Sequence, residues 1–170
     1  FPNPRMAELY GTDPMGETAE NIAEKYNISR EEQDRFAVQS HTRAVAAIDS
    51  GKFAEEIAPV TVPQKKGDPL VVSIDERPRR DTTLESLARL KPSFRKDGSV
   101  TAGNSSGMND GAAALLIMSA EKAAALGYKP LVRIIASAAA GVEPRTMGLG
   151  PIPAARKALQ RAGLTIGDLQ

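Results

Sequence analysis

The sequence predicts an α/β fold that follows a helical, loop-rich region. An apolar run at 110–118 precedes a helical pattern at 120–126. A second apolar run, at 131–139, precedes a helical pattern at 154–162. The order strand, helix, strand, helix is typical of an α/β layer. The first hundred residues show helical periodicity, polar loops and one small β element, and the full 170 residues fit one ordinary domain or a large piece of a longer protein.

Two helices are expected in the first fifty residues. Apolar residues in 15–26 recur at i, i+3, i+4 and i+7, which makes one apolar stripe. Ser29 and Glu32 form a capping-box pattern, which predicts a helix that runs to about Ser50 and is terminated by Gly51. One face of this second helix is predicted to carry Phe36, Ala37, Ser40, Ala44 and Ile48.

A small β element should follow these helices. Residues 57–63 and 70–74 are short and β-branched, and a polar turn separates them. They form either a hairpin or a pair of edge strands, because their prolines do not suit central strands. Residues 75–82 are charged and are predicted to form a loop. Residues 83–90 are predicted to form a short helix that directs Leu84, Leu87 and Leu90 inward.

The two apolar runs of the second half are predicted to be strands buried on both faces, because they are apolar almost throughout. Gly127 and Gly163 follow the two helices and supply their C-terminal stops. A loop is expected at 148–153, before the last helix.

Composition excludes several classes of function. The 22 basic and 21 acidic residues nearly balance, so nucleic acid is not an expected partner. The longest apolar run, 112–118, is too short to span a membrane, and the first residues show no signal-peptide pattern, because no apolar segment follows Arg5. The absence of cysteine favours the cytoplasm and excludes a thiolate nucleophile or metal ligand within these residues, and a single histidine excludes a two-histidine metal site. The chain begins without methionine and ends without a terminal signal, so we expect a segment of a longer protein.

Three features are candidates for binding, and each has a simpler alternative. The loop 103–107 could hold a polar ligand with its hydroxyls and amides, or could be a self-contained turn. A basic cluster suits phosphate, or is a solvated loop paired with the acids at 75, 76 and 81. Met15 and Met147 lie beside glycines and either line an apolar channel or fill a core. The lone histidine, His41, is expected to be a surface residue. The basic cluster consists of Arg77, Arg79, Arg80 and Lys91.

Several motifs together resemble the thiolases, the enzymes that make or cleave 3-ketoacyl-CoA. The strongest is Thr101-Ala-Gly-Asn-Ser-Ser-Gly-Met-Asn-Asp-Gly-Ala-Ala-Ala114. The other segments follow the family's order and spacing and lie at 15–21, 29–34, 83–92 and 147–154. The resemblance implies part of an αβαβα sandwich. It assigns 1–108 to a loop domain that holds coenzyme A, 109–127 to the end of the N-terminal half, and 128–170 to the start of the C-terminal half.

The resemblance also implies roles for individual residues toward coenzyme A, which is a substrate here and not a bound prosthetic group. Ser106 aligns with a serine that hydrogen-bonds the pantetheine arm, and Arg79 with an arginine near the nucleotide end. Ser86 and Leu90 align with residues along the coenzyme's path. The two methionines, Met15 and Met147, align with methionines of the pantetheine and acyl channel. Ala102 and His41 complete the predicted coenzyme A-binding set, His41 because some relatives carry a glutamine there.

The catalytic groups of thiolases are missing from these 170 residues, which contain neither a cysteine nor the family's Gly-His-Pro and Asn-Glu-Ala-Phe segments. The resemblance therefore predicts no catalytic residue in this chain and no activity of the segment alone. The longer parent is expected to be a homodimer or homotetramer that transfers acyl groups through an acyl-cysteine intermediate. Two alternatives stay open: a stand-alone coenzyme A or acyl-CoA binding module without catalysis, and an assembly domain that binds no ligand.

Overall fold

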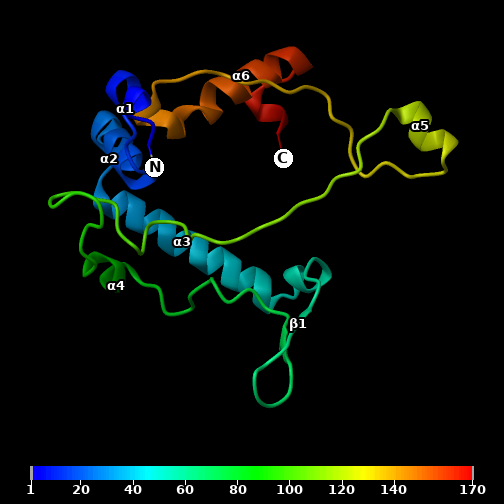
Figure 1. Ribbon diagram of the computed structural model, residues 1–170, viewed down its shortest axis with the longest axis horizontal. Coiled ribbons are helices and arrows are strands. Elements are labelled where there is room, and N and C mark those ends of the chain that lie inside the picture. Colours follow the sequence, from blue (N-terminus) through cyan, green and yellow to red (C-terminus); the bar gives the residue numbers. More distant parts are fainter. Residues whose placement is uncertain (1, 170) are drawn as a thin grey trace. The chain divides into compact units, whose positions relative to one another are not determined.

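The structure, a computed structural model, describes residues 2–169. Its helices and strands are labelled in Figure 1. The chain divides into two units: one is the continuous stretch Met15–Gly107, and the other combines the residues before Met15 with those from Met108 onward.

The unit Met15–Gly107 is built on two helices, α2 (Met15–Tyr26) and α3 (Arg30–Asp49). The predicted capping box opens α3: Glu32 N donates to Ser29 Oγ at 3.2 Å, and Ser29 N donates to Glu32 Oε2 at 2.8 Å. Both predicted helices are confirmed. A 3₁₀ turn, η1 (Lys52–Glu55), follows Gly51, whose φ of 75° suits a residue without a Cβ.

The β element is an antiparallel hairpin of β1 (Val60–Val62) and β2 (Leu70–Val72), with Thr61 paired to Val71. Both strands are shorter than the sequence predicts, because Pro59 and Pro63 flank β1 and cannot donate to the ladder. The predicted short helix is α4 (Leu84–Ala88).

Polar contacts attach the segment after α4 to α2. Ser99 N and Val100 N donate to Glu20 Oε1 at 2.9 and 2.8 Å, and this glutamate is only 4% exposed. Arg95 Nε donates to Glu17 at 2.8 Å, and its Nη2 donates to Asn21. These bonds supplement a small apolar core in this unit, formed by Ala23, Leu87 and Val100.

The second unit contains α1 (Pro4–Tyr10), α5 (Ala120–Ala125) and α6 (Pro151–Ala162), with 3₁₀ turns η2 (Pro144–Leu149) and η3 (Ile166–Asp168). The predicted helices at 120–126 and 154–162 are confirmed. The predicted loop at 148–153 is wrong in part, since α6 already begins at Pro151, where proline suits a first helical turn. Helix α1 was not predicted, although Asn3 before Pro4 is a recognisable helix start, and Asn3 Oδ1 accepts from Arg5 N at 3.0 Å.

The two predicted buried strands do not form. Residues 108–119 and 131–143 carry no strand, and among the described residues the sheet consists of β1 and β2 alone. Leu115 is 82% exposed and Leu131 is 97% exposed. A strand needs a neighbour for its backbone groups, and the described part of this chain supplies none at these runs. Within residues 2–169, no helix combines the length and apolarity needed to cross a membrane.

Candidate functional site

A groove lies within the unit Met15–Gly107. Its volume is about 900 Å³, and four segments line it: α3, the loop 75–82, α4 and the loop 102–107. From α3 it takes Phe36, Ser40, His41 and Ala44, so the face that the sequence assigned to one stripe of this helix looks into the groove.

Six of the eight residues predicted to bind coenzyme A line this groove: His41, Arg79, Ser86, Leu90, Ala102 and Ser106. They come from all four segments, although up to 65 positions separate them in the sequence. The two methionines are not among its lining residues. Met15 is 70% exposed, and Met147 belongs to the other unit. The ligand contacts of all eight residues stay a prediction.

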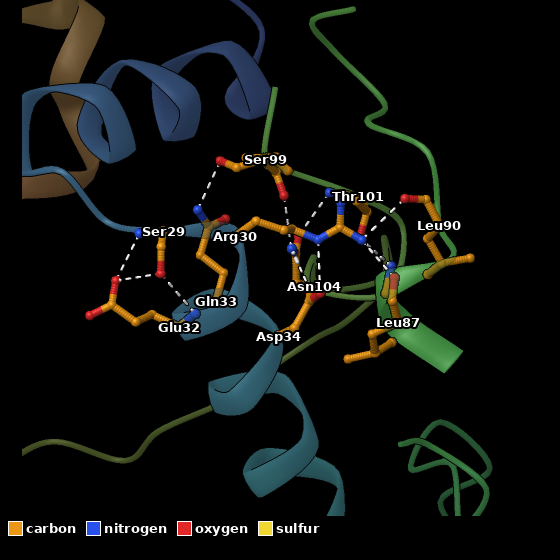
Figure 2. Close-up of polar contacts among 12 residues, drawn as sticks. Ser29, Arg30, Glu32, Gln33, Asp34, Leu87, Leu90, Ser99, Thr101 and Asn104 are labelled. Carbon is orange, nitrogen blue, oxygen red and sulfur yellow. Dashed lines mark hydrogen bonds and ion pairs between the residues drawn. The ribbon is translucent and has the colours of Figure 1, made fainter. Parts of the chain in front are cut away.

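A relay of polar side chains fixes the loop 102–107 (Figure 2). Asn104 Nδ2 donates to Asp34 Oδ1 and to Ser99 O, both at 3.0 Å, while Asn104 Oδ1 accepts from Thr101 N at 2.8 Å. Asp34 is 3% exposed, and Thr101 is fully buried. The loop is therefore held from inside, and its outer residues remain available at the groove.

The same relay holds α4. Arg30 Nε donates to Asp34 Oδ2 at 2.8 Å, and Arg30 Nη2 donates to the carbonyls of Leu87 and Leu90 at 2.6 and 3.1 Å (Figure 2). Leu87 lies in the last turn of α4, and Leu90 lies just beyond the end of this helix at Ala88. Arg30 and Asp34 thus join three walls of the groove, and sequence analysis missed both. The i,i+4 spacing of these opposite charges could have predicted their ion pair. No sequence pattern predicts the hydrogen bond from Asn104 to Asp34.

Gly103 allows α4 and the loop to approach each other closely. A Cβ at this position would lie 2.5 Å from Leu87 Cδ2 and 2.5 Å from Leu90 Cδ1. The space beside this backbone is therefore occupied by two leucine side chains.

The arginines of the loop 75–82 have three different environments. Arg80 pairs end-on with Asp49, at 2.9 and 2.7 Å, and lies outside the groove. Arg79 lies in the groove with its Nε 3.9 Å from Asp81 Oδ1, a loose contact between exposed groups. The guanidinium of Arg77 rests against Gly107 and has no carboxylate partner among the described residues. Arg77 and Arg79 are therefore available to an anion. Lys91, the fourth member of the predicted cluster, does not line the groove.

Two other lining residues have distinct polar roles. Ser86 completes the capping box at the start of α4: its N donates to Thr83 Oγ1 at 3.1 Å, and its Oγ accepts from Thr83 N at 3.0 Å. The hydroxyl of Ser106 has no hydrogen-bond partner in residues 2–169, so it can donate to a ligand.

His41 is half-buried and accepts a hydrogen bond from the backbone. Arg79 N donates to His41 Nδ1 at 3.1 Å. This bond joins α3 to the loop 75–82. Residues 2–169 contain no group of three or more His, Cys, Asp or Glu side chains placed to hold a metal ion.

Comparison with known proteins identifies the family. Residues 3–121 match the family "Thiolase, N-terminal domain", and residues 128–170 match "Thiolase, C-terminal domain". An acetyl-CoA acetyltransferase of Pseudomonas aeruginosa is 59% identical over 91% of this chain and 39% of its own length. A beta-ketoadipyl-CoA thiolase of Acinetobacter baylyi is 53% identical over 99% of this chain and 42% of its own length.

Solved structures agree. The crystal structure of the Bacillus anthracis acetyl-CoA acetyltransferase has a TM-score of 0.85 and 55% identity over 91% of this chain and 39% of that one. The acetyl-CoA acetyltransferase of Syntrophomonas wolfei has a TM-score of 0.82 and 46% identity over the same shares. The chain spans about two fifths of the length of these relatives. It has part of the α/β thiolase fold, as predicted, and it belongs to the thiolase family.

Proposed function

We propose that this chain is the coenzyme A-holding part of a thiolase. The intact protein would condense two acetyl-CoA molecules or cleave a 3-ketoacyl-CoA with free coenzyme A, through an acyl-cysteine intermediate. The cysteine must come from outside these 170 residues, which contain none. One observation carries the proposal: six residues assigned to coenzyme A by family resemblance come from four segments and line one groove, and polar contacts hold these segments together.

The chemistry of the groove suits a long ligand with an anionic end and an amide-rich arm. Its volume of about 900 Å³ falls within the range of ligand and cofactor pockets. Arg77 and Arg79 supply cationic forks for phosphate oxygens. Ser106 offers an unused hydroxyl to an amide of the pantetheine arm, and Leu90 and Phe36 give apolar contact. Binding energy gained at the nucleotide end can then orient the distant thioester.

For the intact protein we further propose a homodimer or homotetramer in the cytoplasm that acts on acyl-CoA in fatty acid metabolism and binds neither membrane nor nucleic acid. The near balance of 22 basic and 21 acidic residues supports the last point. The relatives' names include both acetyl-CoA acetyltransferases and a beta-ketoadipyl-CoA thiolase, so acetyl-CoA and 3-ketoacyl-CoA substrates should both be assayed.

The test is titration calorimetry of the intact protein with coenzyme A. Arg79→Ala should weaken binding about tenfold or more, because it removes a charged donor to phosphate. Ser106→Ala should weaken binding about threefold to tenfold. Arg80→Ala is the matched control, since this neighbouring arginine is paired with Asp49 outside the groove, and it should leave the Kd within twofold.

Equal Kd values for all three variants and the unaltered protein would contradict the proposal. Binding without any thiolysis of acetoacetyl-CoA by the intact protein would support the alternative of a non-catalytic coenzyme A-binding module. The 170-residue segment by itself should show no turnover, because a lost nucleophile costs on the order of 10⁶ in rate.

A further inference from the structure

We propose that His41 is a positioning residue that must be uncharged for the groove to hold coenzyme A well. It acts through the backbone of Arg79 and not through a contact with the ligand. This inference rests on the proposed function and adds a protonation requirement to it.

The hydrogen bond fixes the chemical state of the ring. Arg79 N is a donor, so His41 Nδ1 must carry a lone pair, and the ring's single proton sits on Nε2. An imidazolium carries protons on both nitrogens and cannot accept this bond. In the protonated state a donor would face a donor, and the bond would be lost.

The bond also has few substitutes. Among the described residues, two hydrogen-bonded ties join the loop 75–82 to α3: Arg79 N to His41, and the side chain of Arg80 to Asp49. The second tie is exposed on both sides, with 61% and 54% of the side chains accessible, and lies away from the groove. His41 is therefore the tie that sets the backbone from which Arg79 reaches into the groove. Arg77, two residues earlier, depends on the same stretch of chain.

The charged groups that line the groove beside His41 come from one element, the loop 75–82. The neighbours of His41 one turn away on α3 are all apolar: Ala37, Val38, Ala44 and Val45. Neither the lining residues of α4 nor the loop 102–107 contributes a titratable group. The charged groups that the facing loop contributes are Asp75, Glu76, Arg77, Arg79 and Asp81. His41 is the one histidine of the sequence, so imidazole protonation in this cluster is that of His41 alone.

The direction of the effect separates positioning from direct contact. If His41 acts through Arg79, acid weakens coenzyme A binding because the loop is released. If the ring instead touched a phosphate, acid would strengthen binding because imidazolium attracts an anion. One hydrogen bond corresponds to about a threefold to tenfold change in Kd.

The experiment measures the Kd for coenzyme A by calorimetry, with the intact protein, at pH values from 5.5 to 8. His41→Asn is the key variant, because its Oδ1 can replace Nδ1 as an acceptor and does not titrate. The unaltered protein should bind about threefold to tenfold more weakly at pH 5.5 than at pH 8, relative to His41→Asn at each pH. This ratio cancels titration of the coenzyme's phosphomonoester, whose second pKa is near 6. Dephospho-coenzyme A, which lacks that group, should give the same ratio.

His41→Ala should bind about threefold to tenfold more weakly at pH 8 and show no further loss in acid relative to His41→Asn. In turnover assays the KM for coenzyme A should move while kcat at saturation stays constant. Melting temperatures of the variants identify a folding defect. The comparison of the unaltered protein with His41→Asn across pH does not depend on His41→Ala, the variant that removes the bond.

Tighter binding by the unaltered protein in acid, relative to His41→Asn, would overturn the inference in favour of direct contact. Equal pH profiles for the unaltered protein and His41→Asn would also overturn it. If Arg79→Ala weakens binding while both His41 variants behave normally, this inference fails and the proposed function stands. If the intact protein binds no coenzyme A at all, both fail.

Discussion

The pair of Asp34 and Arg30 lends itself to a sharp test of how the groove is held together. Asp34→Ala removes the carboxylate that accepts from Arg30 Nε at 2.8 Å and from Asn104 Nδ2 at 3.0 Å. The Asp34 side chain is 4% exposed and that of Arg30 is 25% exposed, so water replaces little of what is lost. We expect the loop 102–107 and α4 both to loosen.

The size of the effect follows from the contacts. A hydrogen bond to a charged group contributes about 1.5–3 kcal/mol, and Asp34 accepts two of them. Arg30 keeps its bonds to the carbonyls of Leu87 and Leu90, which lowers the cost below that of a fully orphaned buried charge. We expect the free energy of local opening to fall by about 3 kcal/mol, which corresponds to about a hundredfold faster amide exchange.

Hydrogen–deuterium exchange of the intact protein measures this opening peptide by peptide. The matched control is Arg35→Ala on the same helix, which breaks another i,i+4 pair, Arg35 with Glu31 at 2.6 Å. That pair is 62% and 67% exposed, so its loss should change exchange by no more than about threefold. An Asp34→Ala increase below about fivefold, or equal to that of the control, would refute the relay as the element that holds the loop.

Three further predictions concern other parts of the unit Met15–Gly107. Gly103→Ala should lower the melting temperature and weaken coenzyme A binding severalfold, because the new methyl group overlaps Leu87 and Leu90, whereas Gly111→Ala, with open space around it, should change neither. Burial opposes ionisation of Glu20, but hydrogen bonds from Ser99 and Val100 outweigh burial and lower the pKa of Glu20 from 4.5. The ionised carboxylate therefore stabilises the fold above about pH 4.5, and this stabilisation is lost as the pH falls further. Glu20→Gln should flatten this loss of stability in melting curves recorded between about pH 3 and 6. Arg77→Ala should weaken binding of coenzyme A about threefold to tenfold, and a Kd equal to that of Arg80→Ala would contradict its availability to phosphate.

Local sequence signals predicted much of the fold. The helices at 15–26 and 30–49 follow from periodicity and from the capping box at Ser29, both of which act within a few residues. The hairpin was one of two alternatives that the sequence left open. The register, which pairs Val60 with Val72, is known only from the structure. The strands predicted at 110–118 and 131–139 do not form, and the reason is non-local. An apolar pattern predicts that a segment will be buried, but a strand also needs a neighbouring strand from another part of the chain.

The candidate site was predicted less evenly. Family resemblance selected six residues that the structure brings to one groove. Residue chemistry alone left Arg79 and Ser106 as open alternatives, because exposed arginines and serines are common on any surface. The bond from Arg79 N to His41 joins residues 38 positions apart, and no spacing rule predicts it. The same holds for Asn104 and Asp34, which lie 70 positions apart.

Every lining residue of the groove falls between Phe36 and Gly107, inside one uninterrupted stretch of chain. A gene fragment encoding Met15–Gly107 could thus be exchanged between thiolases as a single cassette. In such a chimaera the preference for the carrier molecule should follow the exchanged stretch, because every groove residue belongs to it. Competition between coenzyme A analogues for the chimaera and for each parent would measure that preference.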